Sequence, residues 1–388
     1  MKKMTKVCMI TIKHSPFDDR LFYRESRSLL KNGYYVYIIS AAPNGWKSDG
    51  KHTNLSIEYI NNVKTKSPII NRILALLMLF LKSLRVPVDV YHVHEPETFL
   101  IGMLLKIFTK KKLIYDVYEY YPDVIPLSHG FYRYFLIFMT FFEPLFCRFA
   151  NGIITADGEI AKRYNNFNKN VCILYNFPCL DIFKSQGHQK DIVKLEGQKI
   201  IIYVGGISEK RGILELIKAI HTISKRHPSI KLLLAGEFET KDFKKKCFEY
   251  IKSNNIEKNI DFRGLIPHIK IPEYIWAADI GAALLHSIPK FHKNIPTKQF
   301  EYMACGKPIV GSNLPPIARY INEIGCGILV NPTNVDEIVD AIHYLIEHPK
   351  EAKKMGERGK KAVLEKYNWG KEEKKLFGFY NKVLGGVK

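Results

Sequence analysis

Short apolar runs alternate with stretches of helical periodicity along the first part of the chain. The apolar runs, each of which we expect to be a strand, are Val7–Ile12, Tyr35–Ser40, Val88–His94, Lys112–Val117, Gly152–Thr155 and Val171–Tyr175. Helical periodicity covers Arg20–Lys31, which ends at Gly33, and about Phe99–Phe108. Such alternation is typical of a parallel, doubly wound α/β sheet.

A polar segment, residues 181–198, interrupts this alternation and is typical of a linker. Further strands are then expected at Ile200–Val204, Ile230–Ala235, Ile260–Arg263, Ile280–Leu284 and Pro308–Gly311. Further helices are expected at Gly212–Lys225, Lys241–Ser253, Pro272–Ala278, Thr297–Cys305, Asp336–Glu347, Lys350–Lys366 and Lys371–Val383. The pattern therefore predicts two Rossmann-like doubly wound domains, residues 1–180 and 199–370, facing a central cleft. We expect the last helix, residues 371–388, to pack back on the first domain.

Composition and charge narrow the choice of partner. The 388 residues are 46% hydrophobic and 25% charged, which excludes a disordered chain. They include 59 Lys+Arg against 38 Asp+Glu, so the net charge is 59 − 38 = +21. This excess predicts an anionic partner. It is spread over both halves, and no zinc-finger spacing or basic-plus-heptad segment is present, so we do not expect a nucleic-acid binder.

The cysteines and the N-terminus bear on the cellular compartment. Seven cysteines form no Cys-x-x-Cys pair, which fits reduced thiols in the cytosol better than a secreted disulfide framework. Met1–Lys6 is basic, but the apolar run that follows it is too short for a signal peptide. The sequence therefore predicts a cytoplasmic protein.

Two apolar segments raise the question of a membrane. Ile73–Leu81 and Tyr134–Phe142 are both nine residues long, whereas a spanning helix needs about 20 apolar residues. The second segment lies within the aromatic stretch Phe131–Phe149, which carries Arg133 and Arg148 near its ends. Such a helix could lie in the interface of an anionic membrane, or it could be a buried core helix. Both interpretations stay open from the sequence.

A glycine pair follows the first strand of the second domain. Gly205 and Gly206 allow close approach of a ligand to the backbone, and Arg211 and Gly212 lead into a helix. Cations beside a helix N-terminus suit a phosphate group. The alternative is an ordinary strand-to-helix turn with solvated basic side chains.

A second cluster lies at residues 294–306. Thr297 starts a predicted helix, Lys298 falls in its first turn, and Glu301 follows one turn later on the same face. A cation in a first turn opposes the helix dipole, and a bound anion would offset that cost. A carboxylate at Glu301 could accept two hydrogen bonds from a diol such as ribose, or it could be an exposed helix residue. Together these residues describe a site for a nucleoside diphosphate.

Several ordered motifs resemble those of retaining glycosyltransferases of family 4, in a subgroup that builds bacterial surface polysaccharides. The motifs are HSPFDDRLFYRESRSLLKNGYYVYIIS, YHVHEPET, YVGGISEKRGILELIKAI and PTKQFEYMACGKPIV, and they span nearly the whole chain. The resemblance implies two Rossmann-like domains in the GT-B arrangement. It also implies transfer of a sugar, with retention, from a nucleotide-diphosphate sugar, for which a UDP-sugar is expected, to a saccharide or lipid-linked acceptor.

The resemblance implies roles for particular residues. Arg211 and Lys298 would contact the donor diphosphate beside Gly205 and Gly206, and Glu301 would bind the ribose. His94 and Tyr118 are the catalytic candidates of the first domain. The further cleft candidates are His14, Arg20, Asn294 and Thr297.

The sequence departs from the family pattern at three places. Lys293 stands where the family has the first Glu of its Glu-x7-Glu signature, so the donor sugar must be held differently. Gly206 replaces an Arg of many relatives, and Tyr118 replaces a His common in the subgroup. Asp18 and Asp19 before Arg20 fit either a cleft position or a charged loop.

No metal or cofactor is expected. His92 and His94 alternate on one strand and share a face with Glu95 adjacent, but no further ligand cluster is evident. The chain also contains no Asp-x-Asp pair, so we expect a metal-independent reaction at the inner face of the plasma membrane, where an anionic surface is a candidate partner. The alternatives are a UDP-sugar epimerase of similar fold, or a non-catalytic protein that binds anionic surfaces.

Overall fold

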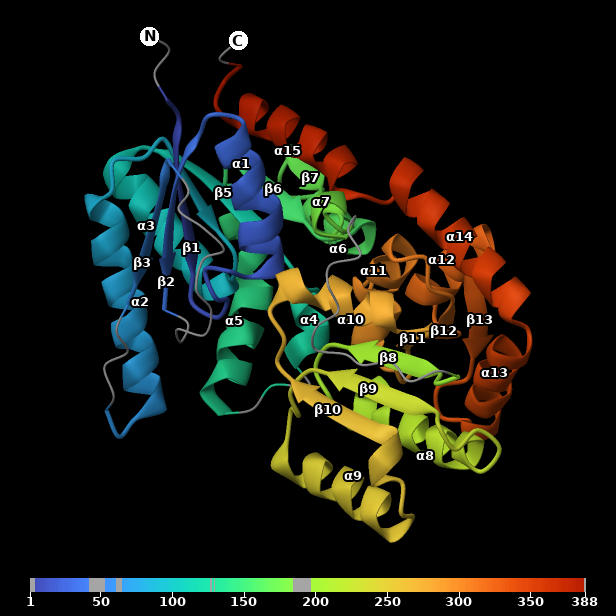
Figure 1. Ribbon diagram of the computed structural model, residues 1–388. Coiled ribbons are helices and arrows are strands. Elements are labelled where there is room, and N and C mark those ends of the chain that lie inside the picture. The colour runs from blue at the N-terminus through green and yellow to red at the C-terminus, as the bar shows by residue number, and fades with distance from the viewer. Residues whose placement is uncertain are drawn as a thin grey trace. The chain divides into compact units, whose positions relative to one another are not determined.

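The computed structural model describes residues 4–41, 53–60, 65–125, 128, 130–183 and 197–386. The chain divides into two compact units (Figure 1). Unit 1 combines Met1–Asn176 with Trp369–Lys388, and unit 2 is Phe177–Asn368. Most of the expected linker, residues 184–196, lies outside the described residues.

Unit 1 is built on a parallel sheet. In the described residues its seven strands have the order β3-β2-β1-β4-β5-β6-β7. The strands are β1 (Lys6–Thr11), β2 (Tyr35–Ser40), β3 (Leu55–Tyr59), β4 (Val90–Val93), β5 (Lys112–Val117), β6 (Gly152–Thr155) and β7 (Val171–Ile173). The helices are a π-helical segment η1 (Asp19–Ser26), α1 (Arg27–Lys31), α2 (Pro68–Arg85), α3 (Pro96–Thr109), α4 (Tyr121–Val124), α5 (Gly130–Cys147), α6 (Gly158–Tyr164) and α15 (Trp369–Val383).

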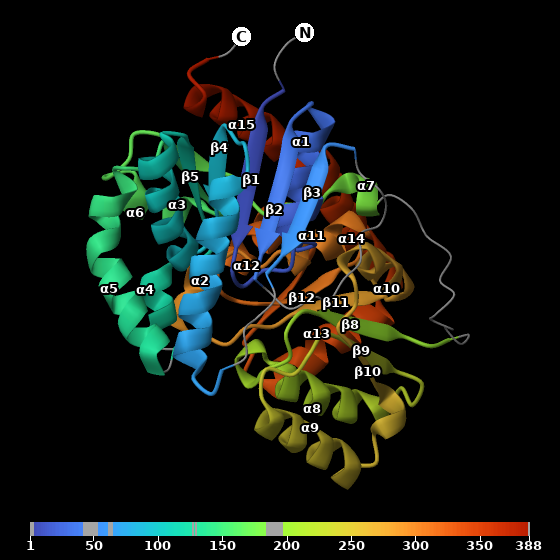
Figure 2. The same ribbon diagram turned by 90° about the vertical axis from the view of Figure 1, so that its left-hand side faces the viewer.

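Alternate residues of β4 show which elements cover each face of this sheet. The Tyr91 hydroxyl donates to the carbonyl of Ser83 in α2, at 3.4 Å. The next residue, His92, shares a 2.8 Å hydrogen bond with the Tyr380 hydroxyl of α15. Because successive side chains of a strand point to opposite faces, α2 and its neighbours α3 and α5 cover one face, and η1 and α15 cover the other. Figure 2 shows α2, α3 and α5 on the near side of the sheet.

The C-terminal helix α15 therefore belongs to unit 1. Its Trp369 Nε1 donates to the Ser28 hydroxyl of α1 at 2.8 Å. Its Phe379 ring lies so close to Gly152 of β6 that a Cβ there would come within 2.4 Å of it. These contacts fix the helix on the sheet of unit 1, although it is separated in sequence from the rest of that unit.

Unit 2 repeats the architecture. Its six described strands have the order β10-β9-β8-β11-β12-β13, all parallel. They are β8 (Ile200–Val204), β9 (Lys231–Ala235), β10 (Ile260–Gly264), β11 (Ile280–Ala283), β12 (Ile309–Ser312) and β13 (Gly327–Val330). The helices are α7 (Leu180–Phe183), α8 (Ile213–Ser224), α9 (Lys241–Ser253), α10 (Ile271–Ala277), α11 (Lys298–Ala304), α12 (Pro315–Ile324), α13 (Val335–Glu347) and α14 (Pro349–Glu365). Short 3-10 turns are η3 (Glu209–Arg211), η4 (Glu257–Asn259), η5 (His268–Lys270) and η6 (Pro289–His292).

The prediction of two Rossmann-like parallel sheets is confirmed. That the two domains face each other across a central cleft stays a prediction. The apolar pattern missed the strands β3 and β13 and the helices α4, α6, α7 and α12. All five residues of β3 are only half-buried, so its apolar signal is weak, as is common at a sheet edge.

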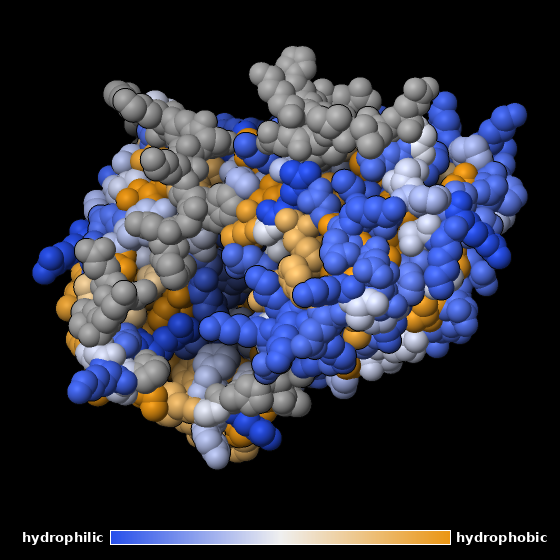
Figure 3. Space-filling view, turned by 60° about the horizontal axis from the view of Figure 1, so that its bottom comes forward, coloured by the Kyte–Doolittle hydropathy of each residue, from blue (hydrophilic) through white to orange (hydrophobic). Residues whose placement is uncertain are grey.

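One side of unit 1 exposes an unusual amount of apolar surface. Of the 23 large hydrophobic side chains exposed among the described residues, 17 lie on α2, α3 or α5 or just after α5, and five lie in unit 2. In Figure 3, hydrophobic residues gather at the left, the side that holds α2 in Figure 1. None of the described helices combines the length and the apolar character needed to cross a bilayer. The segments Ile73–Leu81 and Phe131–Phe149 are thus neither wholly buried nor spanning.

Candidate active site

In unit 1, three predicted site residues follow strands that are neighbours in the sheet. His14 follows β1, His94 follows β4, and Tyr118 follows β5. The Tyr118 hydroxyl and His94 Nδ1 share a 2.7 Å hydrogen bond. The rings of His14 and Tyr118 meet edge to face, with centroids 4.9 Å apart. The carboxyl ends of adjacent parallel strands thus bring the three side chains together, where α/β sheets bind ligands.

Arg20 is held beneath these residues by buried partners. Its guanidinium donates two hydrogen bonds to Asp116, at 2.9 and 3.0 Å, and one to Asn176 Oδ1 at 2.6 Å. Its Cζ lies 5.3 Å from the centre of the Tyr118 ring. The backbone of Arg20 is fixed as well, because Asp18 caps η1 and accepts from the Arg20 amide at 2.9 Å. Arg20 therefore carries a fixed positive charge under the His94–Tyr118 pair.

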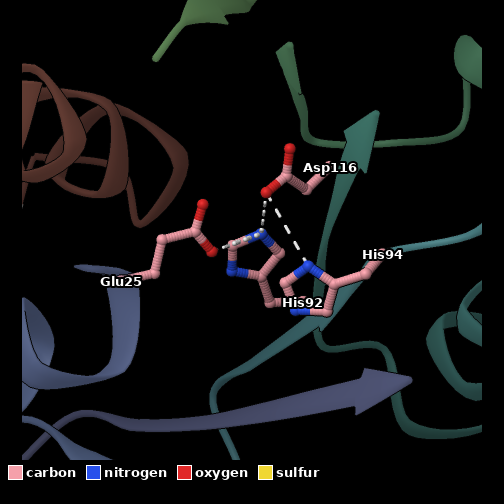
Figure 4. A group of neighbouring side chains, drawn as sticks. All are labelled: Glu25, His92, His94 and Asp116. Atoms are coloured by element: carbon pink, nitrogen blue, oxygen red, sulfur yellow. Dashed lines mark ion pairs between the residues drawn. The ribbon is translucent and has the colours of Figure 1, made fainter. Parts of the chain in front are cut away.

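Four buried titratable residues, Glu25, His92, His94 and Asp116, lie close together (Figure 4), and the two acidic ones contact this guanidinium. Asp116 Oδ2 lies 3.8 Å from His92 Nε2 and 3.7 Å from His94 Nδ1, and Glu25 Oε2 lies 3.8 Å from His92 Nε2. The two imidazole rings stack with centroids 4.6 Å apart. Sequence reasoning did not identify Glu25 or Asp116. Asp116 could have been noticed, because it is a charged residue inside the apolar run of β5.

Burial and neighbouring charges separate the pKa values of the two carboxyl groups. Burial and the nearby Asp116 charge raise the pKa of Glu25 well above its ordinary value. Burial opposes the charge of Asp116 too, but the Arg20 guanidinium and the nearby His94 imidazole outweigh it and lower the pKa of Asp116. Burial lowers the pKa of His92 well below its ordinary value. Asp116 is thus the ionised partner of Arg20, whereas the surroundings favour the neutral forms of Glu25 and His92.

The same four residues also group in the manner of metal ligands. Their ligand atoms lie within 4.8 Å of one another, which is close enough for one ion. However, Arg20 Nε lies 3.0 Å from Glu25 Oε1 and 2.9 Å from Asp116 Oδ2, so a guanidinium already stands between the two carboxylates. A metal ion would have to displace this positive charge or share its place. The donor set therefore fits an internal ion pair better than a metal site.

Glu95, which follows the histidines in sequence, has another role. Glu95 accepts hydrogen bonds from the Thr11 and Thr98 hydroxyls and from the Lys13 amide, the last at 3.1 Å. These bonds fix the loop that follows β1 and carries His14. The grouping of His92, His94 and Glu95 considered from the sequence is therefore wrong, because Glu25 and Asp116 are the carboxylates that approach the histidines.

His14 is a cation at neutral pH. Burial disfavours its charge, but the attraction of Asp18, whose Oδ2 lies 3.2 Å from His14 Nδ1, raises the pKa of His14 to about 9. Burial and the nearby carboxylates raise the pKa of Tyr118 well above its ordinary value, so its hydroxyl stays protonated. His94 Nε2 is buried and has no hydrogen-bond partner among the described residues. Unit 1 thus offers a protonated imidazole, a neutral hydroxyl and an unused imidazole nitrogen.

In unit 2, the predicted glycine loop lies against the chain that follows β9. Gly205 adopts a φ of 124°, a conformation that side-chain-bearing residues rarely adopt. A Cβ on Gly236 would lie 1.9 Å from the Gly205 carbonyl oxygen, so the two backbones touch. The Tyr203 hydroxyl donates to the Gly206 carbonyl at 2.8 Å and supports the loop from below. The loop is thus held open at its outer side, as close approach of a ligand to the backbone requires.

Lys298 is the most informative residue of this site. It is only 6% exposed, and its Nζ makes no hydrogen bond to any described residue. The Nζ lies 3.6 Å from the centre of the Tyr203 ring and 3.2 Å from the position of a Cβ on Gly205. Burial and the positive charge of Arg211 lower the pKa of Lys298 well below its ordinary value. A buried amine without a partner, aimed at a glycine loop, is suited to receive an anion.

Arg211 stands on the other side of the loop. Its Nε donates to Glu239 Oε1 at 3.1 Å, and its Cζ lies 5.8 Å from the centre of the Phe291 ring. Glu239 was not identified from the sequence, because it follows β9 and only the sheet order brings it next to β8. The Gly205 loop is therefore flanked by the basic side chains of Lys298 and Arg211. The carboxylate of Glu239, which the sequence did not predict, lies beside it as well.

The remaining candidates of unit 2 lie at the start of α11. Glu301 is 4% exposed, so the alternative of an exposed helix carboxylate is wrong. Its Oε1 lies 4.0 Å from His268 Nδ1, and its charge favours the protonated form of Lys298. Thr297 is the N-cap residue of α11, and Asn294 Oδ1 is buried without a partner among the described residues. Lys298 and Glu301 are thus one helical turn apart on α11, all of whose residues are buried.

The fold and these two groups of residues define a class of protein. Two Rossmann-like sheets, one with a cationic glycine loop followed by a buried carboxylate, are typical of proteins that bind nucleotides. Residues 185–362, just under half of the chain, match the family model described as glycosyl transferases group 1.

Similar proteins and solved structures agree with this match. An uncharacterized glycosyltransferase of Methanocaldococcus jannaschii is 22% identical over 75% of each chain. The alpha-D-kanosaminyltransferase of Streptomyces kanamyceticus is 22% identical over 49% of this chain, a match that spans about half of that relative. Sucrose-phosphate synthase from Thermosynechococcus elongatus has a similar fold, with a TM-score of 0.77, 16% identity and coverage of 99% and 100% of the two chains. Anabaena HepE, solved with UDP-glucose, gives a TM-score of 0.73 with 15% identity over 97% and 99%.

The protein is therefore a glycosyltransferase with the GT-B fold, and its second unit carries the match to the group 1 glycosyl transferases.

Proposed function

We propose that this enzyme is a retaining glycosyltransferase of family 4 that uses a UDP-sugar. It transfers the sugar to a hydroxyl group of a saccharide or lipid-linked acceptor, in the synthesis of a cell-surface polysaccharide. The observation that carries the proposal is the buried amine of Lys298, which has no hydrogen-bond partner among the described residues and points at the Gly205 loop, one turn before Glu301.

In this proposal unit 2 binds the donor. The backbone at Gly205 and Gly206 and the cations of Lys298 and Arg211 hold the diphosphate, because charge-assisted hydrogen bonds to phosphate are strong. Glu301 accepts hydrogen bonds from the two ribose hydroxyls. The departure of the diphosphate is stabilised by these fixed cations without a metal ion. Lys293, in place of a carboxylate, leaves the donor sugar to other groups, for which Asn294 and Thr297 are candidates.

Unit 1 supplies the acceptor side. The His94–Tyr118 pair and the cationic His14 lie together at the strand ends, and buried Arg20 and Asp116 fix them from below. In the proposed reaction the bond from the sugar to the diphosphate breaks as the acceptor oxygen attacks from the same face, and the acceptor hydroxyl proton passes to the departing diphosphate oxygen. No protein nucleophile is needed, and His94 and Tyr118 orient the reacting groups.

Two of the similar proteins support this choice of donor and reaction. HepE, which shares the fold, was solved with UDP-glucose, and the kanosaminyltransferase is named for transfer of an amino sugar. A lipid-linked acceptor would place the reaction at the inner face of the plasma membrane, with the enzyme in the cytoplasm.

The test is release of UDP by the purified full-length protein from a panel of UDP-sugars, with and without a lipid-linked acceptor. We expect UDP release that depends on the acceptor and falls in Glu301→Gln. The matched control is Glu365→Gln, which changes an exposed carboxylate on α14 and should release UDP like the wild type. Release of an altered UDP-sugar without acceptor would instead indicate an epimerase. The proposal is refuted if no donor yields UDP and Glu301→Gln binds UDP as the wild type does.

A further inference from the structure

The exposed surface of α2, α3 and α5 has a composition that no other part of the described structure shares. We call the exposed large hydrophobic side chains of these helices, together with Phe149, the apolar face. On α5 they include Tyr134 and Phe141, on α3 Ile107 and Phe108, and on α2 Ile73. The three helices are adjacent, and the Phe80 and Phe108 rings of α2 and α3 lie 5.9 Å apart between centroids. The apolar face is therefore continuous across three helices.

Polar groups are nearly absent from this surface. Every exposed position that the structure describes on α2, α3 and α5 is a hydrophobic residue, a glycine or an arginine. The carboxylates within the three helices, Glu97 and Glu143, are both buried and paired with Arg72 and Arg163 respectively. The exposed charges here are therefore all positive.

The charge at the edges is also positive. Arg85 at the end of α2 and Lys110 directly after α3 are exposed, as are Arg133 within α5 and Arg148 directly after it. Each of these cations lies beside exposed apolar positions of the same helix. A continuous exposed apolar patch indicates an interaction site rather than ordinary surface.

From these observations we propose that the apolar face docks on an anionic lipid bilayer. A protein partner would need about one hydrogen bond per 100–200 Å² of interface. The Tyr134 hydroxyl is nearly the only group of the apolar face that could make such a bond. A bilayer interface requires none, because apolar and aromatic side chains enter the acyl region while cations pair with anionic headgroups. The inference rests on the proposed function for its purpose, since docking would bring unit 1 to a lipid-linked acceptor.

The test is cosedimentation of the full-length protein with vesicles, in the absence of any donor. We expect binding to equimolar phosphatidylglycerol and phosphatidylcholine, and weaker binding to phosphatidylcholine alone. Phe141→Glu, at a side chain that is 78% exposed, should lower the partition coefficient about tenfold or more. Arg133→Glu should lower it by about fivefold or more, and added salt should reduce that difference.

The matched control is Leu364→Glu on α14 of unit 2, a hydrophobic side chain that is 48% exposed but outside the apolar face. It should bind vesicles like the wild type. If Phe141→Glu unfolds at a lower temperature than the wild type, Ile107→Glu, at a side chain that is 70% exposed, takes its place.

Three results would overturn the proposal. They are no binding to anionic vesicles, equal loss in Phe141→Glu and Leu364→Glu, and self-association that Phe141→Glu abolishes while vesicle binding is absent. Because no donor is present, a protein without transferase activity would still give a clear result, so the docking proposal and the proposed function fail separately.

Discussion

Donor binding should take up a proton at Lys298. In the free protein, burial and the positive charge of Arg211 lower the pKa of this amine well below its ordinary value and so favour its neutral form. A diphosphate bound at the Gly205 loop would place negative charge beside Nζ, and an opposite charge within about 4–6 Å shifts a pKa by about 1–3 units toward the charged form. The amine would then be protonated in the complex.

The magnitude follows from this shift. At a pH between the pKa values of Lys298 in the free and the bound protein, up to one proton is taken up for each UDP bound. The affinity for UDP then falls by up to about tenfold for each unit that the pH rises. A shift of about two units corresponds to about 2.7 kcal/mol of binding free energy. The direction of this pH dependence follows from the lowered pKa of Lys298 in the free protein. Because that pKa rises when UDP binds, the complex is favoured at lower pH. The experiment belongs near pH 8, above the second phosphate pKa of about 6, so that the ligand itself does not titrate.

Isothermal titration calorimetry measures the proton uptake directly. UDP is titrated into the protein in two buffers of different ionisation enthalpy, and the difference in heat gives the number of protons bound. We expect uptake approaching one proton for the wild type and none for Lys298→Met, which keeps the length of the side chain but cannot be protonated. The matched control is Lys290→Met in the nearby η6, which should take up protons like the wild type. Zero uptake by the wild type, or equal uptake by Lys298→Met, would refute the reasoning.

Three further outcomes are expected. Glu301→Gln should weaken UDP binding about 10- to 100-fold, because hydrogen bonds to a charged acceptor contribute about 1.5–3 kcal/mol each, whereas inorganic diphosphate, which has no ribose, should bind at least as well as before. Tyr118→Phe should lower kcat about tenfold with little change in the urea unfolding free energy, since it removes the 2.7 Å bond that orients His94; an unchanged kcat would exclude a role in the reaction. Asp116→Asn should cost about 3 kcal/mol in urea unfolding at pH 7 by leaving Arg20 without its main partner, and the cost should shrink at acid pH. The last sign follows because a carboxyl group with a lowered pKa stabilises the fold above its unfolded pKa and loses that contribution as the pH falls through its folded pKa.

Much of the candidate site could be predicted from the order of motifs. Lys298 and Glu301 were predicted from their spacing at a helix start, and both lie one turn apart in the fully buried helix α11. Their partners could not be predicted in this way. Glu239 approaches Arg211 only because β9 lies beside β8, and Glu25 approaches Asp116 only because η1 covers the sheet at β5. Sequence spacing reports neighbours within one element, whereas these contacts depend on the strand order.

By itself, the sequence determined the repeated strand–helix pattern and with it two parallel sheets, because apolar runs and their periodicity act locally. It also showed that the apolar runs Ile73–Leu81 and Tyr134–Phe142 are too short to span a bilayer. Only the tertiary structure decided which side of α2 and α5 covers the sheet and which stays exposed, since that depends on what the neighbouring elements leave uncovered. It likewise decided the charge states, because the pKa values of Lys298 and Glu25 follow from burial and from charges brought close by the fold rather than by the chain.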